Sequence, residues 1–293
     1  MKYILIFAFG FLMPFSCIAL MQAPKMSESE LIKYINRKEY DFEKTIGHIR
    51  FYLQGNPSLD QSLKTNTILR NIARNFAHGD QLLVAAKLST PGAIEWVKNL
   101  LSTQTKEEQQ DLWFSLFKNP TQDSLAKMEI LLKAGIDINI KNGSGDSALM
   151  RSIPFKKPGS AFLNTPEDIA NIQKKLFTAL IAHKADLNVK NNVQESALTM
   201  AISNHDVDLV EELLKAGADA NIKSYNGEPA LVDALGVIAY NGDARIFKAL
   251  IKAGADPLLK DDKGKSAYDH AEELNVDLSD LNAPQKKSRC AIQ

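Results

Sequence analysis

Cysteine is nearly absent from this sequence, which contains only Cys17 and Cys290 among its 293 residues. Because Cys17 lies in an N-terminal run that we expect to be removed, no intrachain disulfide is expected and packing alone must hold the fold. Aromatic residues are also few, at 8%, while 45% of the residues are hydrophobic. This composition favours helices that pack through leucine, isoleucine and alanine.

Net charge is absent as well, since 35 basic residues balance 35 acidic ones. No long-range field therefore favours nucleic acid or an acidic surface, and we expect no nucleic-acid partner. The charge balance by itself does not indicate which partner the protein binds.

Recognisable catalytic patterns are missing. No GxSxG occurs, Gly143 and Gly145 in NGSGD predict a hairpin turn and not a phosphate loop, and Cys290 lies in a tail. The histidines lie in different parts of the chain, without the spacing of a zinc site: His48, His78, His183, His205 and His270. We therefore expect no enzyme activity, no cofactor, no metal site and no small-molecule substrate.

One apolar run, residues 3–20, follows a charged start and ends in small residues. With Cys17 and Ala19 at its end, this pattern predicts a signal peptide over residues 1–19, cleaved after Ala19. The alternative is an uncleaved membrane anchor, although the run is short for a span and contains Pro14. We expect an exported protein, periplasmic or secreted.

Residues 196–223 have the pattern of two short helices followed by a looped exit. Ser196 is placed to cap the first helix, and Gly217 to end the second. Apolar residues at spacings of three and four mark one face of each helix: Leu198, Ala201, Ile202, Leu209, Val210, Leu213 and Leu214. Two such short helices cannot bury both faces against each other, so the unit needs neighbours.

The same pattern recurs along the chain. Each exit contains an aspartate, and a helix start follows 12 residues later in every copy. The aspartates are Asp137, Asp186, Asp219 and Asp256, and the matching helix-start residues are Leu149, Leu198, Leu231 and Tyr268. Because this offset is constant, the variable spacing between copies must come from insertions between the two helices of a unit.

These motifs resemble the ankyrin repeat, with its TPLHxA helix start and LLxxGAD exit. The matching segments are SALMRS at 147–152, SALTMA at 196–201, PALVDA at 229–234, SAYDHA at 266–271, and the exits at 213–219 and 250–256. No copy has the TPLH tetrapeptide. The resemblance implies an all-α, ankyrin-type helical solenoid of about five to six repeats over residues 82–276, and a non-enzymatic protein–protein interaction module.

The segments flanking the repeats have separate expected roles. Residues 20–81 are helical in pattern but lack the exits, which predicts an N-terminal helical cap. The alternative is a separate functional domain, such as a cryptic enzyme. Residues 277–293 are expected to form a flexible C-terminal tail.

An insertion enlarges the unit after Ile153. Thr165 and Pro166 predict the start of a long second helix that runs to about His183. The preceding loop combines aromatic and basic side chains, which suits a partner contact, or else its phenylalanines pack onto the solenoid. The loop candidates are Phe155, Lys156, Lys157 and Phe162.

The resemblance also implies a binding surface on the concave side, made by hairpin tips and first helices. Carried onto this chain, the first-helix candidates are Met150, Thr199 and Val232. Tyr225 is the strongest tip candidate because it is a large aromatic residue in a loop, although it could instead cover its neighbour's backbone.

The chain ends in CAIQ at residues 290–293, preceded by basic residues. This ending matches a prenylation motif at Cys290 and raises the alternative of a secreted bacterial effector tethered to a host membrane. A membrane partner is expected only if Cys290 is lipidated or the signal is uncleaved. The other interpretation is coincidence, because prenylation is cytosolic and conflicts with export.

Overall fold

A computed structural model describes residues 42–55, 81–154 and 167–278. These residues belong to two compact units. The first contains 42–55, 81–103 and 129–135, and the second contains 104–128, 136–154 and 167–278. Across these ranges the regular structure is α-helical, and the only extended pairings are isolated bridges at Lys141–Ser147 and Lys223–Pro229. The all-α prediction is confirmed.

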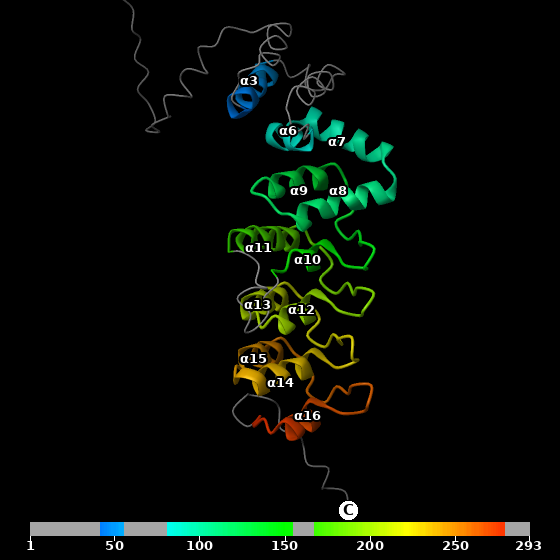
Figure 1. Cartoon of the computed structure of the whole chain (residues 1–293), viewed down its shortest axis with the longest axis vertical. Coiled ribbons are helices and arrows are strands. Elements are labelled where there is room, and N and C mark those ends of the chain that lie inside the picture. The colour runs from blue at the N-terminus through cyan, green and yellow to red at the C-terminus, as the bar shows by residue number, and fades with distance from the viewer. Residues whose placement is uncertain (1–41, 56–80, 155–166, 279–293) are drawn as a thin grey trace, which may run out of the picture. The chain divides into compact units, whose positions relative to one another are not determined.

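The first unit contains short helices packed in sequence order (Figure 1). Helix α3 (Phe42–Gly55) packs against α6 (Gln81–Leu88), and α6 packs against α7 (Pro91–Thr103). Ala85, Ala93 and Val97 are fully buried in this unit. Small and branched side chains there allow the short helices to pack closely.

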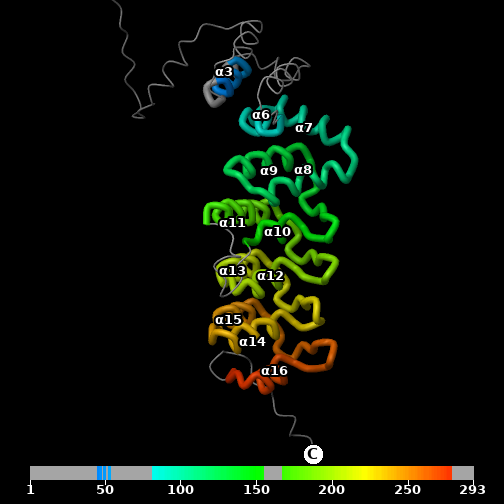
Figure 2. Tube along the Cα trace, in the orientation of Figure 1, coloured from blue at the N-terminus to red at the C-terminus, as the bar shows by residue number. Residues whose placement is uncertain are grey.

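The second unit is a series of helix pairs. First helices α10, α12, α14 and α16 follow one another, with α11, α13 and α15 alongside them and hairpin loops on the opposite side (Figures 1 and 2). Helix α8 packs against α10. The bounds are α8 (Lys106–Lys118), α9 (Ser124–Lys133), α10 (Ala148–Arg151), α11 (Glu167–Ala182), α12 (Ala197–Ser203), α13 (Val207–Lys215), α14 (Ala230–Asn241), α15 (Arg245–Lys252) and α16 (Ala267–Leu274).

Helix α9 is divided between the two units: residues up to Met128 belong to the second and those from Glu129 to the first.

Hydroxyl caps begin the first helices, as the sequence predicts. Ser196 accepts from the N–H of Thr199 at 3.2 Å, and Ser266 caps α16 in the same way. Both starts are capping boxes, because the residue three positions on bonds back to the cap. Helix α14 begins after Pro229 and has no side-chain cap. Proline supplies the backbone angle there but no hydroxyl.

The apolar faces predicted from spacing form the core of the second unit. Leu198, Val210 and Leu213 are fully buried, and Phe247 and Leu250 repeat the arrangement on α15. Burial of each such side chain contributes roughly 2 kcal/mol. Helix α11 is long and ends at Ala182, which confirms the predicted second helix.

The exit loops share one hydrogen-bond ladder. In each loop the aspartate carboxylate accepts from the N–H two residues on, at 2.9 Å. The asparagine two positions after the aspartate accepts from the N–H of the next loop's aspartate, at 2.7 to 2.9 Å. The rungs join Asn139 to Asp186, Asn188 to Asp219, and Asn221 to Asp256. The ladder thus fixes the register of successive repeats.

Four hairpins, residues 142–146, 191–195, 224–228 and 261–265, repeat one backbone geometry. In each, the first residue's N–H donates to the carbonyl of the fifth at 2.8 to 3.0 Å, and the fourth residue donates back to the first. The fourth residue has positive φ: Gly145, Gln194, Gly227 and Gly264. The prediction that NGSGD forms a turn is confirmed.

Candidate partner-binding surface

Two adjacent hairpin tips carry exposed apolar side chains. Tyr225 is 65% exposed and Val193, on the preceding tip, is 59% exposed. Exposed aromatic and aliphatic groups on a rigid loop suit a protein contact. Sequence reasoning selected Tyr225 but missed Val193, because a single valine in a turn does not indicate exposure.

The hairpin that carries Val193 is held by contacts with the preceding hairpin. The N–H of Asn192 donates to the carbonyl of Ser144 at 3.0 Å, and its Nδ2 donates to the carbonyl of Gly143 at 3.1 Å. A Cβ on Gly145 would lie 2.8 Å from the backbone nitrogen of Asn192. Glycine is therefore required there both for its positive φ and for space.

The three first-helix candidates lie inside the protein. Met150, Thr199 and Val232 are 1%, 2% and 5% exposed. This corrects the expectation that these side chains face a partner. For Thr199 the physical reason is the capping box, in which its hydroxyl accepts from the N–H of Ser196 at 2.8 Å; Met150 and Val232 belong to the apolar core.

In each first helix, the residue that follows the third helical position is exposed or half-buried. Arg151 is exposed, and the corresponding side chains of the later repeats are half-buried: Met200, Asp233 and His270. Two of them contact the start of their own hairpin, nine residues earlier. The Ser224 hydroxyl bonds Asp233 Oδ1 at 3.3 Å, and His270 Nε2 lies 2.9 Å from Asp261 Oδ2.

Acidic side chains are concentrated at the ends of the hairpins. Asp146, Glu195 and Glu228 occupy the last hairpin position in three successive repeats and are half-buried. Burial, together with the nearby charge of Glu228, raises the pKa of Asp233 to about 7, although the Ser224 hydrogen bond opposes the shift. Among the described residues, Asp233 Oδ2 has no hydrogen-bond partner. We call Asp146, Glu195 and Glu228 the acidic strip, and its negative charge suits cationic groups of a partner.

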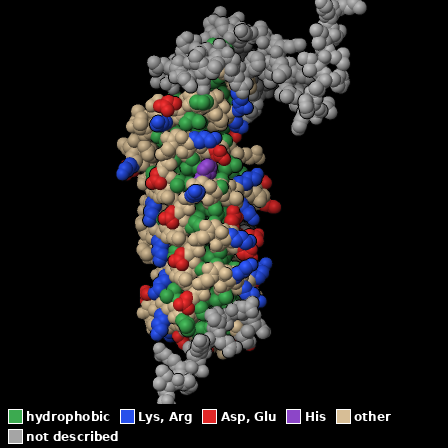
Figure 3. Space-filling view, turned by 180° about the vertical axis from the view of Figure 1, so that it is seen from behind, with side chains coloured by type: hydrophobic (Ala, Val, Ile, Leu, Met, Phe, Trp, Pro, Cys, Tyr) green, Lys and Arg blue, Asp and Glu red, His purple; other side chains and the backbone are tan. Residues whose placement is uncertain are grey.

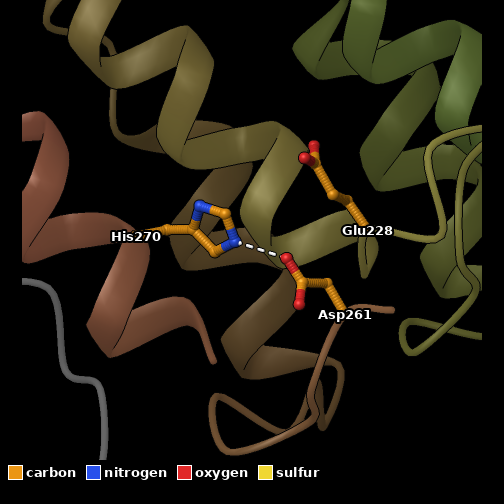
Figure 4. Close-up of side chains that lie close together, drawn as sticks. All are labelled: Glu228, Asp261 and His270. Atoms are coloured by element: carbon orange, nitrogen blue, oxygen red, sulfur yellow. Dashed lines mark hydrogen bonds and ion pairs between the residues drawn. The ribbon is translucent and has the colours of Figure 1, made fainter. Parts of the chain in front are cut away.

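The last hairpin contains a buried carboxylate. Asp261 Oδ1 accepts from the N–H groups of Lys263 and Lys265 at 2.9 and 2.8 Å, and Oδ2 faces His270 (Figure 4). Burial would raise the pKa of Asp261, but the hydrogen bonds from Lys265 and His270 outweigh it, so this pKa lies below its ordinary value. Glu228, from the preceding hairpin, lies within 4.8 Å of both groups.

The second helices carry a groove of different character. It has a volume of about 500 Å³ and lies between α13 and α15. Its lining combines several cations with a few apolar side chains: Glu211, Leu214, Lys215, Arg245, Lys248, Ala249, Lys252 and Ala253. Lys215 and Arg245 pair with Glu211 and Asp243 at 2.8 and 2.6 Å. The groove and the acidic strip therefore suit partners of opposite charge.

Elsewhere the charges are mixed. Figure 3 shows basic and acidic side chains interspersed, with apolar ones between them, over the described residues of one face. This agrees with the zero net charge, because neither sign forms a continuous field on that face.

Several predicted features lie outside the described residues. These are the loop residues Phe155, Lys156, Lys157 and Phe162, the lipidation candidate Cys290, the signal peptide over 1–19, and the tail beyond residue 278. Within the ranges that the structure covers, no helix is long and apolar enough to cross a membrane.

The repeated geometry agrees with a comparison with known families. Residues 169–261 match the family model for ankyrin repeats, in three copies. The predicted resemblance and the ankyrin-type helical solenoid are confirmed. The total number of repeats and the N-terminal cap remain predictions. Ankyrin repeats indicate a protein–protein interaction module, and the family is generally non-enzymatic.

Proposed function

Residues 169–261 match the family model for ankyrin repeats, and on that premise we propose that this is an exported, non-enzymatic module that holds a protein partner on its hairpin tips. The observation that carries the proposal is the pair of exposed apolar side chains, Tyr225 and Val193, on successive hairpin tips. Such anchors, surrounded by polar groups, are typical of binding hot spots.

The charge around these anchors supports a partner with basic groups. Glu195 and Glu228 end the hairpins that present Val193 and Tyr225. A lysine or arginine of the partner would pair with these carboxylates and lower the cost of their partial burial. The partner we propose therefore inserts an apolar side chain between the tips and places a basic residue beside it.

Site-specific crosslinking tests this surface. A photoreactive phenylalanine analogue at Tyr225, in the full chain expressed in its native cell, should form one major adduct. The same analogue at Lys248, on the cationic groove, is the matched control and should not form that adduct. Adducts from both positions, or from Lys248 alone, would contradict the proposal.

Substitution of the anchors tests their contribution. A Val193→Ser and Tyr225→Ser double variant should weaken binding of the crosslinked partner by about 1,000-fold, because hot-spot side chains each contribute roughly 2 kcal/mol. Both side chains are mostly exposed, so the thermal midpoint should stay within about 1 °C. Unchanged affinity would exclude this surface.

The proposal of export depends on the N-terminal run, and the alternative of membrane tethering depends on CAIQ. The intact mass of native material reports on both at once. Export predicts loss of residues 1–19 and an unmodified Cys290. A prenyl group on Cys290 would favour the secreted effector tethered to a host membrane instead.

A further inference from the structure

At the first and last hairpin junctions, the last residue of one hairpin lies near the first residue of the next. The residue types at these two positions change along the chain. Upstream, the first residue of one hairpin, Asn191, donates from Nδ2 to Asp146, the last residue of the preceding hairpin, at 3.0 Å. In the final pair, Asp261 occupies the position of Asn191 and Glu228 that of Asp146. An amide donor facing a carboxylate is thus replaced by a second carboxylate.

The imidazole of His270 faces the carboxylate of Asp261, and the side chain of Glu228 lies nearby without contacting the ring (Figure 4). The ligand atoms of Glu228, Asp261 and His270 all lie within 4.8 Å of one another. The side chains of Asp261 and His270 are only 1% and 12% exposed, so water screens them poorly. Glu228 is half-buried and comes from the neighbouring repeat, so the cluster joins two repeats.

Two lysines of this region form their ion pairs with carboxylates outside the cluster. Lys265, which takes the place of Glu228 in the last hairpin, pairs with Glu273, and Lys223 bonds Asp262 at 3.2 Å. A further carboxylate oxygen, Asp233 Oδ2, is buried without a hydrogen-bond partner among the described residues. Partly buried carboxylates of like charge are stable together only with a compensating cation or proton.

We propose that Glu228, Asp261 and His270 form a binding site for a divalent transition-metal cation of the Zn²⁺ class. Imidazole and carboxylate ligands suit Zn²⁺, whereas Mg²⁺ and Ca²⁺ prefer oxygen ligands alone. Nε2 and Oδ2 are 2.9 Å apart and would separate to about 3.4 Å when each lies about 2.1 Å from one tetrahedral ion. Glu228, with a carboxylate oxygen within 4.8 Å of both atoms, is the third protein ligand, and a water molecule would take the fourth position.

Two further details make the site chemically consistent. Asp261 Oδ1 is fixed by the N–H groups of Lys263 and Lys265, which leaves Oδ2 as the ligand oxygen and orients it. The cation takes the place of the proton shared by Nε2 and Oδ2, and that proton moves to Nδ1 or to solvent. The bound ion would cross-link the last two repeats and stabilise the terminal one.

Sequence spacing did not indicate this site, because its ligands come from two hairpins and a helix. His270 and Asp261 are nine residues apart in the sequence, and Glu228 belongs to the preceding repeat. The expectation of no metal site depended on local motifs, which detect only ligands supplied by one segment.

Zinc titration of the full chain tests the proposal. We expect one ion per chain by calorimetry and a thermal midpoint that rises with Zn²⁺ and falls again with chelator. Mg²⁺ at the same concentration should produce no shift.

Matched variants locate the ion. His270→Ala and the half-buried Glu228→Gln should each weaken Zn²⁺ binding by about tenfold or more. Glu228→Gln keeps the shape of the side chain and should fold normally if His270→Ala does not. Two controls, His205→Ala and Cys290→Ser, should bind like the wild type. Absence of binding, or equal binding by wild type and Glu228→Gln, would overturn the proposal.

Glu228 belongs to both proposals, so partner binding and metal binding are separated by variants that leave Glu228 in place. Val193→Ser with Tyr225→Ser should leave the Zn²⁺ affinity unchanged, since neither residue belongs to the cluster. Failure of either proposal would therefore leave the other intact.

Discussion

The first and the last hairpin junctions of the second unit share a backbone and differ in chemistry. In the first, Asn192 fits closely over Gly145, and Asn191 donates to Asp146. In the last, Asp262 lies over Gly227, and Asp261 faces His270 and Glu228. A common frame thus carries an amide–carboxylate pair at one end and a cluster of ionisable groups at the other.

The comparison shows that the backbone of a repeat can stay the same while the side chains at the junction between repeats change. The backbone turns and the exit ladder are the same at both junctions. The side chains that fill the frame are free to vary because each repeat contacts mainly its neighbours. We interpret the first junction as structural and the last as the place where ionic conditions control stability.

The largest expected effect on the free energy of unfolding comes from replacing the two turn glycines, Gly145 and Gly227, by alanine. Gly145→Ala should destabilise by about 3 kcal/mol, because it combines a positive φ with a close backbone atom. Gly227→Ala has the same φ cost, but its Cβ would meet only the side chain of Asp262, which can move, so about 1.5 kcal/mol is expected.

Urea unfolding of both variants measures this difference. Gly143→Ala is the control, because a Cβ added there would meet no atom within 4 Å and the φ of Gly143 is not positive. An equal decrease in the free energy of unfolding for Gly145→Ala and Gly227→Ala would show that the two junctions do not differ in rigidity.

The second prediction concerns pH and Asp233, beside the last junction. The unfolded carboxyl ionises with a pKa near 3.8, whereas the folded one stays protonated until its pKa of about 7. Folding therefore becomes less favourable as the pH rises from about 4 to 7, and the loss is complete above that range. Asp233→Asn removes the charge and should be about 2 kcal/mol more stable than the wild type at pH 8.

Thermal unfolding at several pH values, with chelator present, checks this prediction. The stability gap between Asp233→Asn and wild type should widen from about pH 4 to pH 7 and then stay constant. The exposed Glu272→Gln is the matched control and should show a much smaller pH-dependent gap. A gap independent of pH would contradict burial as the cause.

The third prediction tests the exit ladder common to both junctions. Asn188→Leu removes the acceptor for the N–H of Asp219 and should cost about 1 kcal/mol. Leu258→Asn is the reverse change at the corresponding position of the last exit loop, where leucine is exposed. It should alter stability by less than about 0.5 kcal/mol, since no further loop follows it among the described residues. Similar effects in both variants would argue against the ladder.

The smallest effect is expected at the turn between the two junctions. Gln194 has φ of 65°, whereas the other three hairpins have glycine at this position. Gln194→Gly should stabilise by about 0.5 kcal/mol, because relief of strain exceeds the extra entropy lost by glycine. Differential scanning calorimetry would detect the rise in midpoint, and a fall would mean that the Gln194 side chain makes a compensating contact.

Much of the second unit could be predicted from local patterns. Ser196 and Ser266 indicated helix starts, Gly217 a helix end, and Thr165 with Pro166 the long α11. Caps, apolar spacing and turn residues act within a few residues of themselves, so they are readable without the fold.

The surface was less predictable. Met150, Thr199 and Val232 were correctly placed on first helices but are buried, whereas Val193 was overlooked although it is exposed. Exposure at a given helical position depends on how the cap folds back and on what the next repeat covers. Neither is encoded in the spacing of apolar residues.

The amino-acid sequence alone thus determined the helix pairs, their loops and the constant interval between exit and next helix start, because these follow from local hydrogen bonding and hydrophobic period. Only the tertiary structure decided which side chains face outward, and it alone brought Glu228 beside Asp261 and His270. The physical reason is that stacking joins residues distant in sequence, and its register is set by contacts between repeats.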